Sequence, residues 1–363
     1  MRTEEFRPIT PRVDVVIPTD GRESLGLLLA SIDGPPDRLP RRVILVDRRR
    51  SPHAPLPTSA LSPELRARLV VVTSDGLNRA AARNLGWQAS RAPWIAFLDD
   101  DVVLCRGWLS ELRRDLTGAA PDVAGIRGRV LEPPSSGGSR SEPELDVERP
   151  EYAAWSSGDV AYRTSVLRGL GGFDERLASA GRDDDDLTIR AARVGLRLVA
   201  GARTVVHPAW PASPWSHVQA EGSRADDVLM RVLHGSRWLE RTAVPASVLV
   251  ALMTTMAGIA AAIAAALGHS VVAAGGLLVW LVGTVACSRR LPDPSSPAEL
   301  AATLATSMAI APAAVWHQLV GELRAAVPGR RVVNGRAATV EISPPPAGND
   351  VESGHRALGR HCA

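Results

Sequence analysis

Two runs of aspartate are the groups in this sequence most suited to chemistry. Asp99–Asp101 follow an apolar segment, and Asp183–Asp186 follow Gly181 and Arg182. Adjacent carboxylates repel one another, so such runs are costly unless a cation is nearby. Carboxylate oxygens are the ligands that Mg²⁺ and Mn²⁺ favour, and a carboxylate held near a hydroxyl group can act as a general base. The runs therefore indicate a divalent-cation site and a base.

Each run also has a simpler interpretation as the acidic start of a helix. Residues 108–116 and 187–193 both have helical patterns, and each follows one of the runs. Acidic groups stabilise the positive end of a helix dipole. Residue types alone leave both interpretations open, although four carboxylates in residues 183–186 exceed what capping requires.

The elements that would position these groups form an α/β pattern. The segments between the strands have helical patterns at residues 23–32 and 78–89. The predicted strands are short, apolar runs at residues 13–17, 42–47, 69–73 and 94–98. Such alternation predicts a mostly parallel sheet that is covered on both faces, with ligands beyond the carboxyl ends of the strands.

Seven motifs in this order resemble family 2 glycosyltransferases. The resemblance covers about residues 13–210, and it implies the A-type nucleotide-sugar-binding fold with inverting sugar transfer that depends on Mg²⁺ or Mn²⁺. The motifs are Val-Val-Ile-Pro-Thr (15–19), Asp47, Ala-Arg-Asn (82–84), Phe-Leu-Asp-Asp-Asp (97–101), Gly-Gly-Phe-Asp-Glu (171–175), Gly-x-Asp-Asp-x-Asp-Leu (181–187) and Val-Val-His (205–207).

The resemblance implies a role for each matching residue. Asp101 would hold the metal bound to the diphosphate, with His207 as a further ligand. Asp184 would be the general base, with Asp183 in the place of the family's more usual Glu. Thr19, Arg22 and Asp47 would line the pocket for the base and ribose of the donor. Arg83 would face the nucleotide, and Asp99 and Asp100 would hold the ribose and the sugar.

One departure from the family pattern lies beside the expected nucleotide pocket. The family often has further Asp, Gly or Ser after the residue matching Asp47, whereas this chain has three arginines, Arg48–Arg50. They could hold a diphosphate or an anionic acceptor, or be solvated, and charge patterning favours the solvated state.

A long uncharged stretch predicts attachment to a membrane. Residues 243–288 contain no Asp, Glu or Arg, and they divide at Gly268 into two helices. A spanning helix needs about 20 apolar residues, so two transmembrane helices fit; the alternative is a buried hairpin in a soluble protein. Arginines flank both ends, so the positive-inside rule predicts that both ends face the cytoplasm.

The predicted organisation follows from these segments. An N-terminal extension (1–12) precedes a catalytic domain (13–235) that contains a flexible loop (132–150). After the hairpin, residues 299–322 form a third span, or a helix that lies at the interface or packs on the hairpin, which the charges favour. Residues 328–363 form a disordered tail. The predicted location is the cell membrane, with the catalytic domain in the cytoplasm.

Three functions are compatible with this sequence. The first is a membrane-attached glycosyltransferase, acting on a saccharide or lipid-linked acceptor, as in cell-envelope synthesis. The others are a polyprenyl-phosphate sugar synthase and a non-catalytic scaffold that binds nucleotide sugars, which the two acidic runs disfavour. No nucleic-acid partner is expected, because the formal net charge is only +3.

Overall fold

The computed structural model describes two compact units. The first takes in the described residues up to Leu131 and those from Gly158 to Pro208, and the second those from Trp215 to Ala326. The predicted loop at 132–150 and the tail at 328–363 lie outside the described residues. The described residues are 11–50, 54–131, 158–179, 181–208, 215–235, 245–288 and 297–326.

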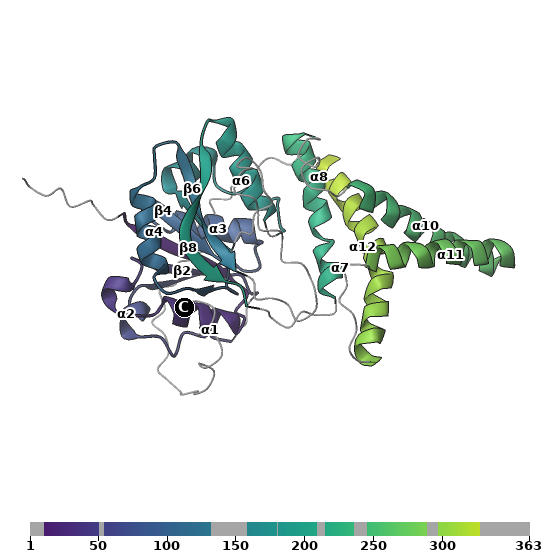
Figure 1. The fold of residues 1–363 in the computed structure, drawn as a ribbon, viewed down its shortest axis with the longest axis horizontal. Coiled ribbons are helices and arrows are strands. Elements are labelled where there is room, and N and C mark those ends of the chain that lie inside the picture. The colour runs from purple at the N-terminus through teal and green to yellow at the C-terminus, as the bar shows by residue number, and fades with distance from the viewer. Residues whose placement is uncertain are drawn as a thin grey trace, which may run out of the picture. The chain divides into compact units, whose positions relative to one another are not determined.

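A mixed sheet of eight strands forms the centre of the first unit, in the order β3-β2-β1-β4-β7-β6-β8-β5 (Figure 1). The four predicted strands are confirmed as β1 to β4. The strands are β1 (Val13–Thr19), β2 (Val43–Asp47), β3 (Leu69–Thr73), β4 (Trp94–Leu98), β5 (Val103–Leu104), β6 (Val123–Leu131), β7 (Asp159–Arg163) and β8 (Arg197–Val206).

Four of the seven strand pairs are parallel, which confirms the mostly parallel sheet that the sequence predicts, and three pairs are antiparallel. The first four strands pair in parallel, with Thr19 opposite Asp47, so their carboxyl ends meet at one edge. β7 is antiparallel to both β4 and β6, and β5 is antiparallel to β8. An apolar run fits either direction when both sheet faces are covered, which is why composition did not reveal these three pairs.

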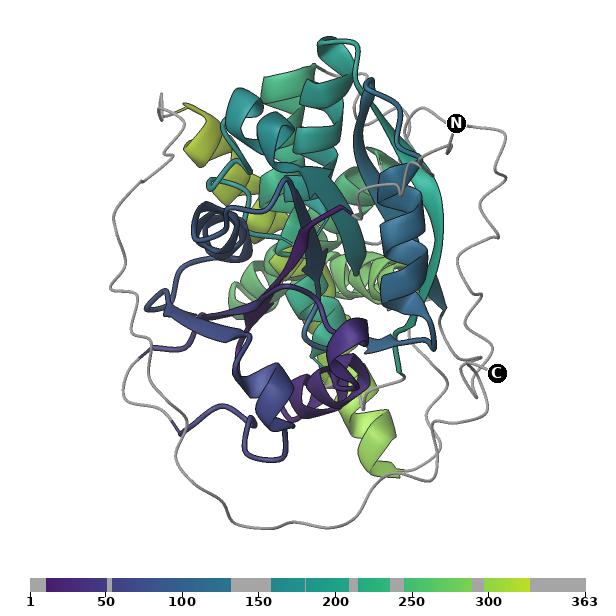
Figure 2. The ribbon, with the colours of Figure 1, turned by 90° about the vertical axis from the view of Figure 1, so that its left-hand side faces the viewer.

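Helices cover both faces of this sheet (Figure 2). Along β1, Val13, Val15 and Ile17 join the core cluster with α1 and α4, and Val16 joins the cluster with α3 and α6. This alternation is the two-residue period of a strand. The helices of this unit are α1 (Ser24–Ile32), α2 (Pro63–Arg66), α3 (Arg79–Gln88), α4 (Trp108–Thr117), α5 (Thr164–Leu170) and α6 (Arg182–Arg193), with a 3₁₀ turn at Pro36–Arg38.

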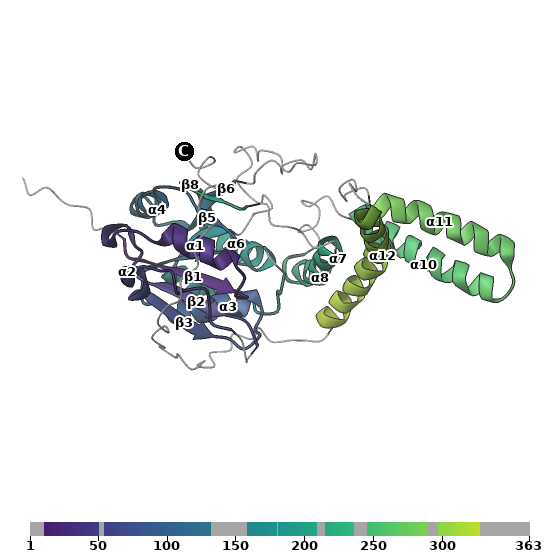
Figure 3. The same ribbon diagram turned by 90° about the horizontal axis from the view of Figure 1, so that it is seen from below.

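The second unit contains only helices among its described residues. The two predicted helices of the uncharged stretch are present, and they pack side by side as a hairpin that turns at Gly268 (Figure 3). The helices are α7 (Ser216–Ala220), α8 (Ser223–His234), α10 (Pro245–Ala266), α11 (Ser270–Ser288) and α12 (Pro297–Ala326).

The division between the units differs from the sequence-based boundary at residue 235. α8 packs against α12, where a Cβ at Gly321 would lie only 2.9 Å from atoms of Ala225 and Val228. Residues 216–235 therefore join the C-terminal helices. The apolar face of α8 meets a partner about 90 residues later in the chain, and local sequence pattern does not reveal such a contact.

Candidate active site

The acidic run after β4 lies where the ends of β1 and β4 meet. Thr19 is buried, and its Oγ1 donates a hydrogen bond to Asp100 Oδ2 at 2.7 Å. The backbone N–H of Asp20 donates to the same oxygen at 3.2 Å. Burial raises the pKa of Asp100 above its ordinary value, against the lowering effect of these two hydrogen bonds.

Each carboxylate of this run has a different partner. Asp99 pairs with Arg79, and Arg83 Nη2 lies 3.8 Å from it. Asp101 Oδ2 lies 3.3 Å from His207 Nε2 and 4.0 Å from Arg22 Nη1. The three arginines reduce the repulsion within the run.

The helix-start interpretation of this run is wrong. α4 begins at Trp108, and its N-cap is Gly107, in the left-handed conformation. Asp101 therefore lies six residues before the cap, so the three carboxylates are free of a capping role. They form a strand-end cluster instead.

Asp101 and His207 meet as the sequence predicts, although they are far apart in the chain. Burial works to raise the pKa of Asp101, but the hydrogen bond from His207 and the charges of Arg22 and Arg79 outweigh it, so the pKa is lowered. Asp101 is therefore ionised at neutral pH. An ionised carboxylate and an imidazole fit a divalent cation, and both side chains are partly exposed.

The protein would supply only part of such a metal's coordination shell. Within the described ranges no three His, Cys, Asp or Glu side chains gather in a metal-binding group. Mg²⁺ and Mn²⁺ commonly take one or two protein ligands, with substrate phosphates and waters as the rest. Two ligands are therefore compatible with a cation that arrives with a diphosphate.

The second acidic run lies in the first turns of α6, in contact with the Arg83 side chain. Arg83 Nη1 donates to Asp184 Oδ2 at 2.6 Å and to Asp183 Oδ2 at 3.0 Å. Its guanidinium carbon also lies 5.1 Å from the centre of the Phe173 ring and 5.6 Å from that of Phe97. Arg83 thus links the two acidic runs, because Asp99 is its third carboxylate neighbour.

The Arg83 side chain is enclosed within the protein. The resemblance expects Arg83 to face the nucleotide, yet its side chain is fully buried. Burial works to lower its pKa, but Asp183, Asp184 and Asp99 outweigh burial and raise it. Arg83 is therefore a permanent buried cation that holds the carboxylates in place.

Asp184 is better placed than Asp183 to meet a ligand. Asp183 is 0% exposed and Asp184 is 5% exposed. The Oδ1 atoms of both side chains are buried and have no hydrogen-bond partner among the described residues. Burial raises the pKa of Asp184, the charge of Arg83 opposes this, and the charge of Asp183 adds to it. A carboxylate with a raised pKa and a free oxygen suits a base.

The last two aspartates of the run have structural partners. Asp185 lies 3.2 Å from Arg182 Nη1, and burial raises its pKa to about 7. Asp186 accepts from Arg190 Nε at 2.8 Å, one turn later in α6. Arg190 also donates to the carbonyl of Gly172 at 2.7 Å, which fixes α6 to the glycine turn beneath it.

That turn depends on Asn84, the neighbour of Arg83 in α3. Asn84 Oδ1 accepts from the backbone N–H of Phe173, and Asn84 Nδ2 donates to the Phe173 carbonyl, both at 2.9 Å. Gly172 has a φ of 72°, and a Cβ there would lie 2.4 Å from Asn84 Oδ1. Only glycine fits, because both the backbone conformation and the space exclude a side chain.

Charge patterning favoured solvated arginines after β2, and Arg50 is exposed, but Arg48 and Arg49 lie beside carboxylates. Arg49 holds Asp47 through two parallel bonds, Nε to Oδ1 at 2.9 Å and Nη2 to Oδ2 at 2.7 Å. Arg49 also lies against Gly21, and Arg48 Nε lies 3.4 Å from Asp20 Oδ1. Asp47, which the resemblance assigns to the nucleotide, is thus already bound to a guanidinium.

Sequence reasoning missed two of these partners, Arg79 and Arg49. Arg79 precedes Arg83 by four residues, which places both on one face of a helix, so the pattern contained this signal. Arg49 lies two residues after Asp47, where an aspartate often binds its own backbone; here the Arg49 N–H donates to Asp47 Oδ1 at 3.0 Å.

A buried pair beside the site was also missed. Asp159 begins β7 opposite Leu98, and its carboxylate accepts from Trp108 Nε1 at 2.6 Å. Arg203 Nε of β8 donates to Asp159 Oδ1 at 2.9 Å. This pair joins the strand beside the acidic run to the strand that ends before His207.

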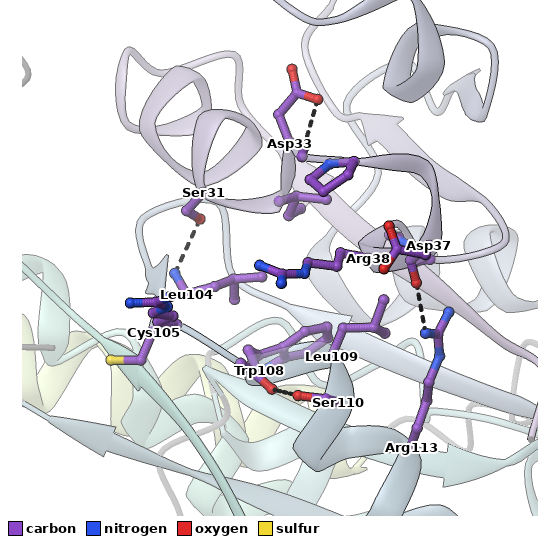
Figure 4. A pocket seen from close by; sticks show the side chains of 16 residues that line it. Ser31, Asp33, Asp37, Arg38, Leu104, Cys105, Trp108, Leu109, Ser110 and Arg113 are labelled. Atoms are coloured by element: carbon purple, nitrogen blue, oxygen red, sulfur yellow. Dashed lines mark hydrogen bonds between the residues drawn. The ribbon is translucent and has the colours of Figure 1, made fainter. Parts of the chain in front are cut away.

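A cavity of about 600 Å³ lies between the end of α1 and the start of α4 (Figure 4). Its lining includes Arg38, Arg106 and Arg113, and Arg38 extends across it. None of the predicted site residues lines this cavity. It is therefore separate from the strand-end cluster.

Comparisons with known proteins find relatives of part of this chain. Residues 14–159 match the sequence profile of Glycosyl transferase family 2. Pre-mycofactocin glycosyltransferases from two Mycobacterium tuberculosis strains are 34% identical over 132 residues, which is 33% of this chain and 27% of theirs. Succinoglycan biosynthesis protein ExoM of Rhizobium meliloti is 31% identical over 122 residues, which is 32% of this chain and 40% of ExoM. The matches thus span less than half of each relative.

Solved structures give a weaker similarity. S. aureus TarS 1-349 in complex with UDP-GlcNAc has a TM-score of 0.47 at 14% identity, covering 86% of this chain and 92% of TarS 1-349. TarS 1-349 in the structure without a named ligand has a TM-score of 0.43 at 18% identity, covering 60% and 65%. Similarities of this size say nothing about ligands.

The matched segment contains most of the strand-end cluster. It runs from β1 to the first residue of β7, and so includes Thr19, Asp47, Arg83 and Asp99–Asp101. Its parallel strands, with the acidic run at their carboxyl ends, have the arrangement expected of the A-type fold. Residues 14–159 are therefore similar to the domain of family 2 glycosyltransferases.

Proposed function

We propose that this protein is a membrane-attached, inverting glycosyltransferase. It moves a sugar from a nucleotide-sugar donor to a saccharide or lipid-linked acceptor at the cytoplasmic face of the membrane. The observation that carries the proposal is the buried Asp184 with an unpaired Oδ1, linked through Arg83 to the acidic run after β4. The names of the relatives add support, since one is a glycosyltransferase and the other a succinoglycan biosynthesis protein.

The proposed reaction is a single displacement. The acceptor hydroxyl attacks the anomeric carbon as its proton passes to the Asp184 carboxylate. The bond from that carbon to the diphosphate oxygen breaks, and the nucleoside diphosphate leaves with the electron pair. Asp101 and His207 would hold Mg²⁺ or Mn²⁺, which as a Lewis acid stabilises the charge on the leaving group.

Membrane attachment is supported by the hairpin. α10 has 22 residues and α11 has 19, which at about 1.5 Å per residue approaches the thickness of a bilayer core. By length and composition, Leu249–Ala266 in α10 and Leu300–Ala326 in α12 could cross a membrane, and the apolar part of α11, Ser270–Ala286, is shorter. Many apolar side chains of the hairpin are exposed, among them Met253, Ile263 and Val282.

Membranes that contain the full chain should test the function directly. They would be incubated with Mn²⁺ and a panel of radiolabelled nucleotide sugars, and label would be measured in lipid and saccharide fractions. We expect transfer from at least one donor. Transfer to lipid phosphate alone would favour a polyprenyl-phosphate sugar synthase, and donor binding without transfer would favour a scaffold.

Asp101→Asn should abolish the metal-dependent part of nucleoside diphosphate binding. The amide is a poorer ligand and carries no charge, while His207 alone holds a divalent cation weakly. Calorimetric titration of the donor's nucleoside diphosphate with and without Mn²⁺ measures the effect. Asp122→Asn, on an exposed surface pair, is the matched control. Unchanged Mn²⁺-dependent affinity in Asp101→Asn would exclude this metal site.

The pH dependence of kcat should reflect the raised pKa of Asp184. A base must be ionised, so kcat should fall as pH drops through that pKa, at a higher pH than an ordinary aspartate with a pKa of about 3.8. Asp185 also has a raised pKa, near 7. The acid limb should persist in Asp185→Asn, and its disappearance there would assign the base to Asp185.

A further inference from the structure

One face of α12 carries an exposed apolar stripe along most of its length. Its six large side chains are each between 47% and 69% exposed, and successive members lie three, four or eight residues apart. Pro312 fills the eight-residue gap on the same face and is also exposed. The stripe consists of Leu300, Leu304, Met308, Trp316, Leu319 and Leu323.

The opposite face of α12 is packed against the rest of the second unit. Ala311 and Ala314 form a buried cluster with Ala251, in the first turns of α10. Gly321 lies against Ala225 of α8 so closely that a side chain would not fit. α12 therefore has one face packed against protein and one exposed apolar face. Its mean hydropathy, in contrast, would fit a membrane-spanning helix.

The neighbour of the C-terminal part of α12 is a charged helix. α8 contains Asp226 and Asp227, and Arg231 pairs with Glu322 of α12. Gln318 Nε2 also donates to Glu322 Oε1 at 2.9 Å. Charged groups are costly in the hydrocarbon core of a bilayer, so α8 and the part of α12 beside it belong outside that core.

α12 also runs in a different direction from the hairpin. Figures 1 and 3 both show it lying across the α10–α11 axis, not alongside these helices. The crossing is at the Ala251 end of α10, the end from which the hairpin starts. If the hairpin crosses a bilayer, α12 lies at the boundary with water.

We infer that α12 lies along the membrane surface and inserts its apolar stripe into the lipid, and is not a third span. This rests on the membrane attachment proposed above. Lipid is the occupant because the stripe belongs to the same helical unit as the hairpin, whose exposed side chains are equally apolar. The 24 residues from Leu300 to Leu323 give a stripe of about 35 Å, a geometry typical of an interfacial helix.

The position of the chain beyond α12 follows from this arrangement. A helix in the membrane plane leaves both of its ends on one side, so residue 363 and the catalytic domain should share a side. A third span would place residue 363 on the opposite side. The two arrangements can therefore be separated by one reporter.

Reporter fusions to the full chain test this inference in bacterial cells. Alkaline phosphatase, active only outside, and green fluorescent protein, fluorescent only inside, would be fused after residue 363 and inserted in the hairpin turn after Gly268. We expect fluorescence after 363 and phosphatase activity at the turn. Phosphatase activity after 363 would overturn the in-plane arrangement. Fluorescence at both positions would show that the hairpin does not cross, so the membrane proposal itself would fail.

A photo-crosslinking residue tests whether lipid covers the stripe. We expect benzoylphenylalanine at Leu304 or Leu319 to capture radiolabelled phospholipid at least ten times more efficiently than at the buried Ala314. Capture of a second copy of this chain from the stripe would identify a protein interface and overturn the inference. Neither experiment depends on transferase activity, so each can fail while the enzyme assay succeeds.

Discussion

Asp184→Asn is expected to lower kcat by about 10²–10⁴-fold, the usual cost of losing a positioned general base. The amide keeps the shape of the side chain, and its oxygen can still accept from Arg83. Affinity for the donor should remain near that of the unaltered protein, because the predicted metal ligands Asp101 and His207 follow β4 and β8 and do not belong to α6. Single-turnover kinetics with a labelled donor, together with calorimetry, would separate the two effects.

Asp183→Asn is the decisive comparison for this prediction. Asp183 has the same guanidinium partner but is completely buried, so it should not meet the acceptor. We expect Asp183→Asn to have a larger effect on the free energy of unfolding than on the rate of the chemical step. If Asp183→Asn loses the chemical step while Asp184→Asn transfers sugar normally, the base is Asp183. If neither loses it, the proposed mechanism is wrong.

Arg83→Met should strongly destabilise the first unit. It leaves Asp183 and Asp184 buried without their cation, and breaking a buried ion pair from one side typically costs about 3–5 kcal/mol. For a domain of this size each kcal/mol lowers the melting temperature by about 2–4 °C. Thermal unfolding of the purified chain in detergent, followed by tryptophan fluorescence, measures the shift.

Arg197→Met provides the matched control for the Arg83 substitution. Arg197 pairs with Asp122 on the surface, where both side chains are about half exposed or more, so its loss should leave the melting temperature close to that of the unaltered protein. A melting temperature that falls equally in both variants would show that the Arg83 cluster contributes no special stability. Arg83→Lys should recover only part of the loss, since lysine lacks the planar fork.

Much of the catalytic fold could be predicted from sequence because its signals are local. The four predicted apolar runs form four strands. The polar groups after β1, β2 and β4 lie at one edge of the sheet, because the carboxyl ends of parallel strands meet there. The meeting of Asp101 with His207 was different. No local pattern joins residues 106 positions apart, and only the order of motifs in the family resemblance supplied that pair.

The partners of the acidic residues were harder to predict because they come from distant elements. Arg83 meets Asp183 a hundred residues later in the chain, so its helix pattern could not distinguish a residue facing the nucleotide from a buried counter-ion. The ion pair between Asp47 and Arg49 was equally hard to predict, because an arginine run on its own is typical of a solvated surface.

The C-terminal helices show the same limit. Their existence followed from hydrophobicity, but the division of α12 into a packed face and a bare face depends on contacts with α8 and α10. Composition averages over both faces. It therefore cannot distinguish a spanning helix from one that lies at a surface.

The anomeric configuration of the first product tests the central claim most directly. Once the donor is known from the radiolabel panel, the reaction can be followed by proton NMR from its first minutes, before any anomer can interconvert. A single displacement assisted by Asp184 predicts that the transferred sugar has the configuration opposite to that in the donor. A product with the donor's configuration would contradict the account, because retention requires a different mechanism from the one built on this carboxylate.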